Sequence, residues 1–585
     1  MRTINYLYII FTSILLHNFL NADNDITIQT SSGITSGVQK NGVITWHDLP
    51  YAEPPVGELR WKAPRNLTNK NLLIQNKKGN FCVQKPSSLG GASGEGNFVG
   101  TEDCLYMDIR KPKNNDKNLP VMFWIHGGGN TSGLKDIYDF SGLVKKENVI
   151  VVSINYRLGP FGWFSHPSIQ NFQNGFDKTS NFGTLDIIKA LEWVNQNIHK
   201  FGGDKNNITI FGESAGGHNV LSLLAAPQAK GLFHKAISQS GYTTSVDYEI
   251  AFNTKHQSID YIGSEEIVSK IYNKTNDLLE IRNKILGLSA YDFYSYYLTE
   301  NSLREIPLLT NDGIVIPKEG LYEALKNPID ISIPVIAGSN RDEVKLWIGT
   351  ALYFIQPEYS FIGSIFGIPR IKIVNEDAFE AFNYYRSSAW QLRGVVEPLN
   401  NLSSAGAKNL YAYRYDWDDH RRRPIADFKK IIGAAHATEI PLIAGNNKLV
   451  GNYGFIIYPN GPSKKYTSKN MMKFWANFAR TGKPGNSTNN IEWINYLDSN
   501  SQNAMILDKK KNLSIKSISN SYQSLIKELE LDNRVNKKEK CVILYQMGVL
   551  IGNDIYEHLE KIYSHKCNKD DSVQFLIDNA SFVSY

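Results

Sequence analysis

Apolar residues in the middle of the chain form short unbroken runs, and segments with helical spacing lie between them. The unbroken runs at 121–125 and 149–154 predict buried strands, and a short β-branched run at 208–211 predicts another. Strand-like segments at 234–240, 334–338 and 410–417 predict three more. Helical spacing predicts helices at 185–198 and 215–224. Strands without polar alternation are buried on both faces, as in parallel sheets covered by helices. The pattern therefore predicts an α/β fold with a large, mostly parallel central sheet and helices on both faces.

The chain has 585 residues, and this length alone suggests about two to four domains. However, no internal repeat and no long Gly/Ser-rich or Pro-rich linker interrupts it, and the motifs described below span most of its length. We therefore predict one α/β domain over residues 23–531. Residues 532–585 are more charged, and we interpret them as a C-terminal helical appendage and tail.

Residues 1–22 have the pattern of a signal peptide. Arg2 gives a positive start, residues 6–16 are apolar, and Leu20-Asn21-Ala22 offers a small-residue cleavage site. The apolar run is too short for a bilayer span, which needs about 20 residues. We predict cleavage and a secreted or periplasmic protein, with an uncleaved membrane anchor as the alternative. No other segment has the pattern of a membrane span.

The formal net charge of +6 comes from 63 basic and 57 acidic residues, a small excess for this length. Basic residues occur in short runs such as 421–423 and 509–511, as is typical of a solvated surface. No groove-reading motif accompanies them, so we expect no nucleic-acid partner.

Four cysteines follow the predicted signal peptide, and an even count in a secreted chain indicates two disulfides. Three pairings exist, and we expect the sequential one, Cys82 with Cys104 and Cys541 with Cys567, because it closes two short loops. No Cys-x-x-Cys occurs, so zinc and thioredoxin-like chemistry are disfavoured, and we expect no metal or cofactor. Eight sequons could carry glycan in a eukaryotic secretory route; they begin at Asn66, Asn130, Asn207, Asn273, Asn401, Asn486, Asn512 and Asn579.

The candidate nucleophile is Ser214, the serine of a Gly-x-Ser-x-Gly motif over residues 212–216. The motif alone also fits a serine that caps a helix between glycines. Here a predicted strand ends before it and a predicted helix begins after it. That context indicates a nucleophile elbow, a strained turn that lifts the hydroxyl above the edge of the sheet. Glycines at 212 and 216 remove side chains that would collide in so sharp a turn.

A Gly-rich loop at 126–129, His-Gly-Gly-Gly, follows a predicted strand and supplies candidate donors for an oxyanion. A plain flexible loop is the alternative for this segment. Backbone N–H groups perform this task, and glycine lets a substrate carbonyl come close. We assign the N–H groups of Gly128 and Gly129 together with that of Ala215, where the helix begins.

The base and the acid should follow the serine in the order Ser, acid, His. Of the histidines beyond a plausible acid, His558 and His565 lie in the charged C-terminal segment and His420 lies in a polar run predicted to be solvated. His436 lies among small residues that let an imidazole reach a cleft, so it is the predicted base. For the acid, Asp342 and Glu343 both follow a predicted strand, and spacing does not separate them.

These motifs resemble the type-B carboxylesterases, which include cholinesterases, liver-type carboxylesterases and many bacterial esterases. The resemblance extends from about Ile26 to about Gly485 and implies the α/β-hydrolase fold. Its motifs follow in family order at 49–61, 102–106, 126–129, 155–162, 211–217, 236–241, 340–343 and 433–440.

The resemblance implies roles that spacing leaves open. It favours Glu343 over Asp342 as the acid, and Cys82–Cys104 matches the first disulfide of the family. Ser240 matches a buried serine that hydrogen-bonds the acid, and Glu213 matches a carboxylate that supports the site. The implied reaction is hydrolysis of a carboxylic ester through an acyl-enzyme on the serine.

The sequence also departs from the family pattern. Cholinesterases have a tryptophan between the first two cysteines that stacks on choline. Here residues 83–103 contain Phe98 as their single aromatic residue. The absence of the tryptophan argues against choline esters as substrates. The second disulfide loop of the family has no cysteines here. Asn130 stands where an aromatic is usual, which predicts a more polar pocket rim, and its sequon should stay bare because a glycan would block the cleft. Val344 replaces a usual glycine without a consequence for the chemistry.

The sequence thus predicts a secreted serine carboxylesterase that acts on a small-molecule ester, as a monomer or a weak homo-oligomer. Alternatives are a cholinesterase-like, lipase-like or amidase specificity. A non-catalytic adhesion or binding protein on the same fold is a further alternative, which the intact Ser214, Glu343 and His436 set disfavours.

Overall fold

The computed structural model describes residues 26–68, 72–74, 80–87, 90–253, 261–274, 276–299, 304–359, 370–421, 426–498, 501–551 and 567–579. The predicted signal peptide, residues 1–22, lies outside these ranges, as do His558 and His565.

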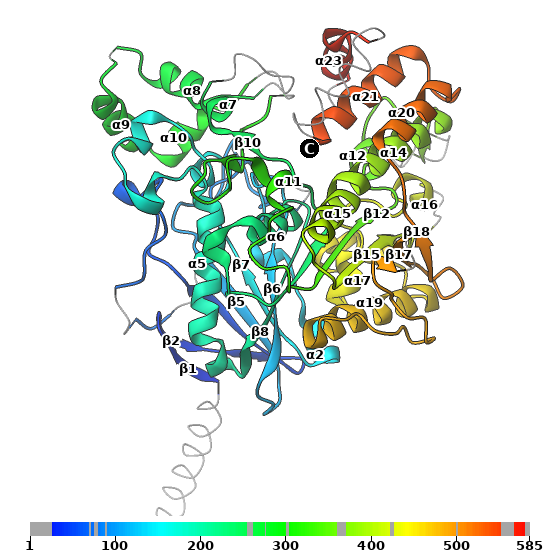
Figure 1. Ribbon diagram of the computed structural model, residues 1–585, viewed down its shortest axis with the longest axis horizontal. Helices are drawn as coiled ribbons and strands as arrows, with labels where there is room; N and C mark the ends of the chain where they lie inside the picture. Colours follow the sequence, from blue (N-terminus) through cyan, green and yellow to red (C-terminus); the bar gives the residue numbers. More distant parts are fainter. Residues whose placement is uncertain are drawn as a thin grey trace, which may run out of the picture.

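A 12-stranded sheet crosses the molecule, with helices on both sides (Figure 1). Its centre is parallel, in the order β17 (Ser501–Leu507), β15 (Leu410–Tyr415), β12 (Val335–Asn340), β9 (Lys235–Gln239), β8 (Gly203–Glu213), β6 (Leu119–Ile125) and β7 (Ile150–Ile154). Antiparallel strands extend both edges: β5 (Tyr106–Pro112), β4 (Val43–Pro50) and β3 (Val38–Lys40) beyond β7, and β16 (Leu497–Asp498) and β18 (Ser514–Ser517) against β17. The predicted α/β sheet is confirmed, with parallel pairing at its centre and antiparallel pairing at its edges.

All six predicted strands are present, and the largest difference is at the start of β8. This strand begins at Gly203, five residues before the predicted position, because Gly203 pairs with Leu119 of β6. The intervening residues 204–207 are polar and at least partly exposed, so their hydrophobicity gave no sign of the pairing. The two predicted helices are α5 (Phe182–Asn197) and α6 (Ala215–Ala225).

Alternate residues of β6 face the two sides of the sheet and belong to two separate hydrophobic clusters. Val121, Phe123 and Ile125 pack in the cluster that contains residues of α5 and α6. Met122 and Trp124 pack in the other cluster, with residues of α2 (Ser141–Glu147), α17 (Ile440–Ala444) and α19 (Pro462–Thr481). The strand is fully buried because both of its faces are covered, which explains its unbroken apolar run.

The C-terminal segment contributes α20 (Tyr522–Leu531), α21 (Lys537–Ile551) and α23 (Lys569–Asp578). Both α20 and α21 pack beside α14 (Glu376–Gln391), in the upper right of Figure 1. The Tyr385 hydroxyl of α14 donates a hydrogen bond of 2.9 Å to Asp532 Oδ2. Among the described residues, no helix combines the length and the apolar character that a bilayer crossing needs.

Candidate active site

Ser214 lies in a sharp turn between β8 and α6, with φ 59° and ψ −124°. This conformation is uncommon for a residue with a side chain, and such strain is typical of functional sites. The flanking glycines have no room for a side chain: a Cβ at Gly212 would lie 2.6 Å from backbone atoms of Gly216, and one at Gly216 would lie 2.0 Å from the carbonyl oxygen of Ile125. Side chains at these two positions would collide with the backbone, as predicted from the sequence. The turn has the form expected of a nucleophile elbow.

The structure brings Glu343 to the imidazole of His436 and places Asp342 elsewhere. Glu343 Oε2 lies 2.6 Å from His436 Nδ1, and both side chains are buried. Asp342 instead accepts hydrogen bonds of 2.6 Å from Arg341, 2.9 Å from the Ala434 N–H and 2.7 Å from Asn383. The two neighbouring acids therefore have different tasks, which their spacing in the sequence does not reveal.

The carboxylate of Glu343 is held by two further donors at its other oxygen. The Ser240 hydroxyl and the Asn340 N–H each donate a hydrogen bond of 2.7 Å to Oε1. Ser240 follows β9 and Asn340 ends β12, so adjacent parallel strands deliver both donors at their carboxyl ends. Ser240 thus makes the hydrogen bond that the family resemblance implied.

Two more buried glutamates lie near His436. Glu213 Oε1 is 3.1 Å from His436 Nε2, the ring nitrogen that points away from Glu343. Glu439 accepts hydrogen bonds of 2.7 Å from Asn340 and 3.1 Å from Gln239. Sequence reasoning missed Glu439, three residues after the imidazole, because a glutamate before an apolar helix is normally a solvated capping residue.

The pKa values of His436 and Glu213 are shifted in this buried cluster. Burial alone would lower the pKa of His436, but the charges of Glu213 and Glu343 outweigh it and raise this pKa to about 9. Burial raises the pKa of Glu213 to about 8, while the charge of His436 works in the opposite direction. The protonation of each group therefore affects that of the other.

Two tryptophans that sequence reasoning missed cover the His436 ring. The ring centroid of Trp347 lies 5.2 Å from that of His436, and the centroid of Trp390 lies 4.7 Å from it. The Trp390 indole N–H also donates to the Ser240 carbonyl oxygen at 3.0 Å. The indoles shield the imidazole from water, which strengthens its interaction with the carboxylates.

The Gly-rich loop lies against Ser214. A Cβ at Gly127 would be 3.0 Å from the Ser214 Cβ, and Gly128 and Gly129 have φ of 104° and 62°. Within the described ranges, no hydrogen bond engages the backbone N–H groups of Gly128, Gly129 or Ala215. These three N–H groups are thus free to bind an oxygen that carries negative charge.

Two expectations about polar residues near the site are wrong. Asn130 does not line a pocket rim: it is 1% exposed, and its side-chain oxygen accepts hydrogen bonds from Asn219 and Tyr156. His420 is not solvated either, since it is 5% exposed and its ring nitrogens lie 2.7 Å from the carbonyl oxygens of Ile457 and Gly433. Both side chains are buried inside the fold, where their polar atoms have hydrogen-bond partners.

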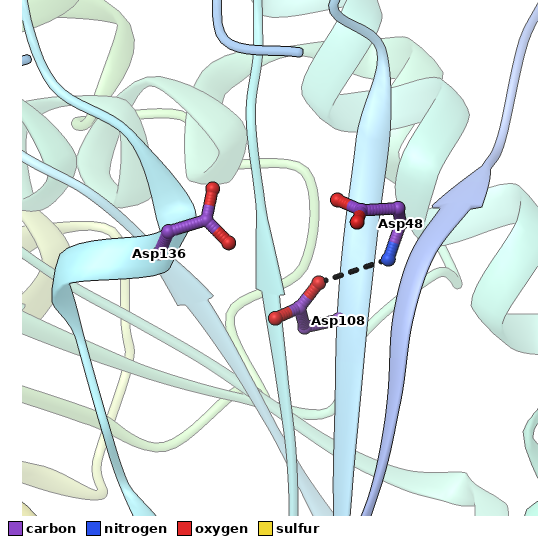
Figure 2. Close-up of side chains that lie close together, drawn as sticks. All are labelled: Asp48, Asp108 and Asp136. Carbon is purple, nitrogen blue, oxygen red and sulfur yellow. Dashed lines mark hydrogen bonds between the residues drawn. The ribbon is translucent and has the colours of Figure 1, made fainter. Parts of the chain in front are cut away.

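Three carboxylates on neighbouring elements have the spacing of a metal site. Figure 2 shows Asp48, Asp108 and Asp136 pointing toward one another from β4, β5 and the short 3₁₀-helix η2 (Lys135–Ile137). The Lys135 ammonium occupies their centre, at 2.7 Å from Asp48, 2.8 Å from Asp108 and 2.8 Å from Asp136. A side-chain cation therefore already performs the charge compensation that a metal ion would supply.

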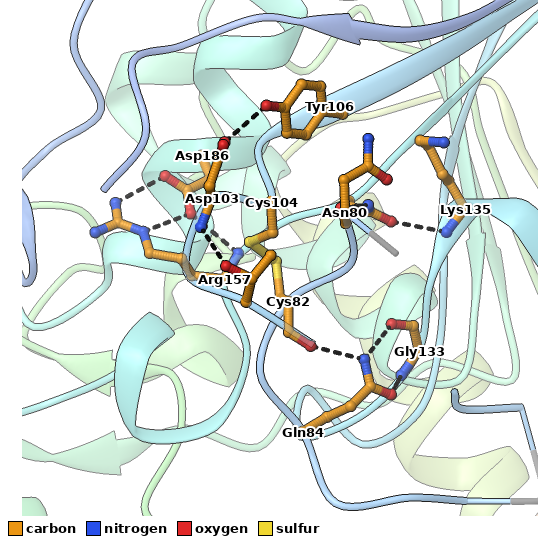
Figure 3. The surroundings of a disulfide bond; sticks show 12 residues. Asn80, Cys82, Gln84, Asp103, Cys104, Tyr106, Gly133, Lys135, Arg157 and Asp186 are labelled. Atoms are coloured by element: carbon orange, nitrogen blue, oxygen red, sulfur yellow. Dashed lines mark hydrogen bonds and ion pairs between the residues drawn. A yellow bond between two sulfur atoms is a disulfide. The ribbon is translucent and has the colours of Figure 1, made fainter. Parts of the chain in front are cut away.

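Both predicted disulfides are present, Cys82–Cys104 and Cys541–Cys567. Gln84, two residues into the first disulfide loop, connects that loop to Gly133, four residues after the Gly-rich loop (Figure 3). Its amide nitrogen donates to the carbonyl oxygens of Cys82 and Gly133, both at 3.0 Å. Its amide oxygen accepts from the Gly133 N–H at 2.9 Å and from the Ala92 N–H at 3.1 Å. All four hydrogen-bonding positions of this buried amide are satisfied.

The sheet order, the strand–serine–helix turn, and an acid and an imidazole that follow later in the chain define an α/β hydrolase. A model of the carboxylesterase family matches residues 24–359 and 381–525. The para-nitrobenzyl esterase of Bacillus subtilis is 33% identical over 497 residues, 83% of this chain and 95% of that protein. Liver carboxylesterase B-1 of Rattus norvegicus is 31% identical over 494 residues, 77% of this chain and 83% of that protein.

Solved structures agree with the sequence relatives. A structure of PNB esterase has a TM-score of 0.66 at 29% identity, covering 84% of this chain and 97% of that chain. The Geobacillus stearothermophilus carboxylesterase EST55 has a TM-score of 0.64 at 27% identity, covering 84% of this chain and 97% of that chain. The chain belongs to the carboxylesterase family and is a carboxylic ester hydrolase.

Proposed function

We propose that the protein is a secreted serine carboxylesterase in which Ser214 is the nucleophile, His436 the general base and Glu343 the acid that orients the base. The observation that carries this proposal is the buried 2.6 Å contact between Glu343 and His436 beside the strained turn of Ser214. An acid held at Nδ1 fixes the ring so that Nε2 is the nitrogen that accepts a proton.

The reaction proceeds in two steps. The Ser214 hydroxyl attacks the ester carbonyl carbon, its proton passes to His436, and the carbonyl oxygen becomes an oxyanion held by the N–H groups of Gly128, Gly129 and Ala215. Collapse of this intermediate expels the alcohol, which takes the proton from the imidazolium. Water then attacks the acyl-enzyme with the same base and the same oxyanion site, and releases the carboxylic acid.

Ser240 and Glu213 support this chemistry without forming bonds to the substrate. Ser240 holds Glu343 in place through its 2.7 Å hydrogen bond. Glu213 lies 3.1 Å from Nε2 and stabilises the imidazolium that forms after proton transfer. Removal of either residue should therefore affect the base more than the binding of substrate.

The proposed substrate is a small ester rather than a choline ester. Phe98, the single aromatic residue between the first two cysteines, is buried and stacks on Tyr294 with ring centroids 4.7 Å apart. Its face is therefore covered and does not offer a cation–π site for a quaternary ammonium group. The name of the Bacillus subtilis relative, para-nitrobenzyl esterase, suggests aromatic alcohol esters as probes.

Two disulfides are compatible with an oxidising compartment and support secretion, to the periplasm or outside the cell. We propose a monomer or a weak homo-oligomer as the secreted form, which acts without a cofactor.

Hydrolysis of p-nitrophenyl esters of graded acyl length tests the proposal, with purified wild type, Ser214→Ala and the control Ser468→Ala. Ser468 is a buried serine of α19 whose hydroxyl donates to the Leu442 carbonyl oxygen, so its loss tests a nonspecific effect. We expect wild type and Ser468→Ala to hydrolyse short esters and Ser214→Ala to be inactive. Absence of any wild-type activity, or retained activity in Ser214→Ala, would overturn the proposal. A preference for long chains would indicate a lipase instead.

A further inference from the structure

A pair of buried asparagines connects the Gly-rich loop to the helix that begins after Ser214. Asn130 directly follows Gly129, and Asn219 lies on α6, four residues after Ala215. The Asn219 side-chain nitrogen donates a hydrogen bond of 2.9 Å to the Asn130 side-chain oxygen. Asn130 is 1% exposed and Asn219 is 0% exposed, so neither amide is in contact with bulk water. Their bond joins the two segments that carry the proposed oxyanion donors.

Tyr156, which follows β7, extends this connection to the start of the Gly-rich loop. Its hydroxyl lies 2.8 Å from the His126 carbonyl oxygen and 3.1 Å from the Asn130 side-chain oxygen. Its ring also stacks on the His126 ring, with centroids 4.4 Å apart. The backbone of Asn130 is held as well, because its carbonyl oxygen accepts 2.7 Å from the Gly159 N–H. The loop is thus fixed on both sides of its glycines.

We propose that Asn130 and Asn219 are positioning residues that set the distance between the Gly128 and Gly129 donors and the Ala215 donor. This inference rests on the proposed function of Ser214. Three consecutive glycines have more conformational freedom than any other tripeptide, so a loop of them holds its N–H groups in place only if its neighbours restrain it. Oxyanion stabilisation depends on donors held at about 2.7–3.1 Å before the reaction begins. The Asn130–Asn219 bond supplies this restraint from the nucleophile helix itself.

The test compares Asn219→Ala, Asn130→Ala and the double variant with wild type, in hydrolysis of a short p-nitrophenyl ester. Since loss of a whole oxyanion donor costs about 10²–10³ in kcat, a misplaced donor set should lower kcat about 10- to 100-fold. KM should change by less than about threefold because the restraint acts on the transition state. The double variant should lose no more activity than the more severe of the two single variants, since both substitutions remove the same Asn130–Asn219 bond.

A second readout separates this role from a general structural one. The readout is the affinity of a reversible inhibitor, an aliphatic trifluoromethyl ketone. Its carbonyl carbon forms a bond with Ser214 Oγ, its carbonyl oxygen becomes an oxyanion, and the serine proton passes to His436. Its affinity should weaken by the same factor as kcat/KM in the Asn219→Ala variant. Asn470→Ala serves as the matched control, because Asn470 is an equally buried amide that bonds Thr488 and Tyr466. This control should retain wild-type kcat and inhibitor affinity.

Tyr156→Phe keeps the inference testable if the alanine variants do not fold, because it removes a single hydroxyl from the same network. We expect it to lower kcat and inhibitor affinity together, by less than Asn219→Ala does. Wild-type kcat in folded Asn219→Ala, or a fall in kcat without a fall in inhibitor affinity, overturns the positioning role. Failure of the proposed function has a different signature, since Ser214→Ala would then retain activity.

Discussion

Glu213 should control the pH at which the enzyme becomes active. Its carboxylate lies 3.1 Å from His436 Nε2. Among the charges that raise the pKa of this imidazole to about 9, that of Glu213 has the largest effect. In Glu213→Gln the amide keeps the shape of the side chain and removes the negative charge. The imidazolium is then less stable, so the pKa of His436 falls. Neutral imidazole, the form that accepts the serine proton in the proposed mechanism, becomes available at lower pH.

The size of the shift follows from the geometry. An opposite charge at such a distance changes a pKa by about 1–3 units, and each unit corresponds to about 1.4 kcal/mol. The variant should therefore reach the upper plateau of kcat/KM about 1–3 pH units below wild type. The plateau itself should be lower, because Glu213 also stabilises the imidazolium that forms during the reaction. Activity relative to the plateau rises at pH 7, while the maximal rate falls.

The assay is a pH profile of kcat/KM from pH 5 to 10 with a short p-nitrophenyl ester, whose acid limb reports the base of the free enzyme. Glu439→Gln is the graded control, because Glu439 is the weakest of the charges that raise the pKa of His436. It should shift the limb in the same direction and by less. An unchanged limb in Glu213→Gln, or a limb that moves to higher pH, would refute the assignment of Glu213 to the base.

Three further predictions concern groups outside the proposed triad. Lys135→Met should lower the free energy of unfolding in urea by about 3–5 kcal/mol, because it removes the ammonium that lies between the buried carboxylates of Asp48 and Asp108. The control Lys326→Met removes an exposed ammonium and should change this free energy by less than about 0.5 kcal/mol, and equal effects would refute the argument. Gln84→Ala should lower the free energy of unfolding by roughly 1 kcal/mol for each of its four hydrogen bonds. It should also lower kcat, because Gly133 loses both of its hydrogen bonds to this side chain. Wild-type kcat in this variant would contradict a link between the first disulfide loop and the segment around Gly133. After expression in a eukaryotic secretory host, glycopeptide mass spectrometry should find a glycan on Asn486 and none on Asn130 or Asn401. Asn486 is exposed, whereas the other two asparagines are buried. A glycan on Asn130 would contradict the structure.

The sheet could be predicted from the sequence because its strands are buried on both faces, which leaves a direct trace in hydrophobicity. β6 illustrates this, since its two sets of alternate residues pack in different clusters. The start of β8 could not be predicted, because residues 204–207 pair through the backbone while their side chains are polar. Backbone pairing without burial leaves no pattern in the side chains.

The candidate site was predictable to the extent that its residues stand in local motifs. Ser214 and the Gly-rich loop are of this kind, and chain order with the neighbouring residues pointed to His436. Trp347 and Trp390 were missed because their contacts with His436 join segments that are far apart in the sequence. Gln84 was missed because its partner Gly133 is also distant along the chain. The same reason explains the errors at Asn130 and His420, whose partners come from other elements. Polar residue type alone indicates a surface position, and only the tertiary structure reveals a buried partner.

The ammonium group of Lys135 has a consequence for the conditions under which this protein keeps its fold. Burial would lower the pKa of Lys135, but Asp108, Asp136 and Asp48 outweigh it and raise this pKa above its usual range, so the group stays charged at neutral and alkaline pH. A bound metal ion dissociates on dilution and is removed by chelators, whereas a cation on the chain is present at fixed stoichiometry. The cluster therefore needs no supply of divalent ions. This part of the structure is therefore independent of the calcium content of the medium.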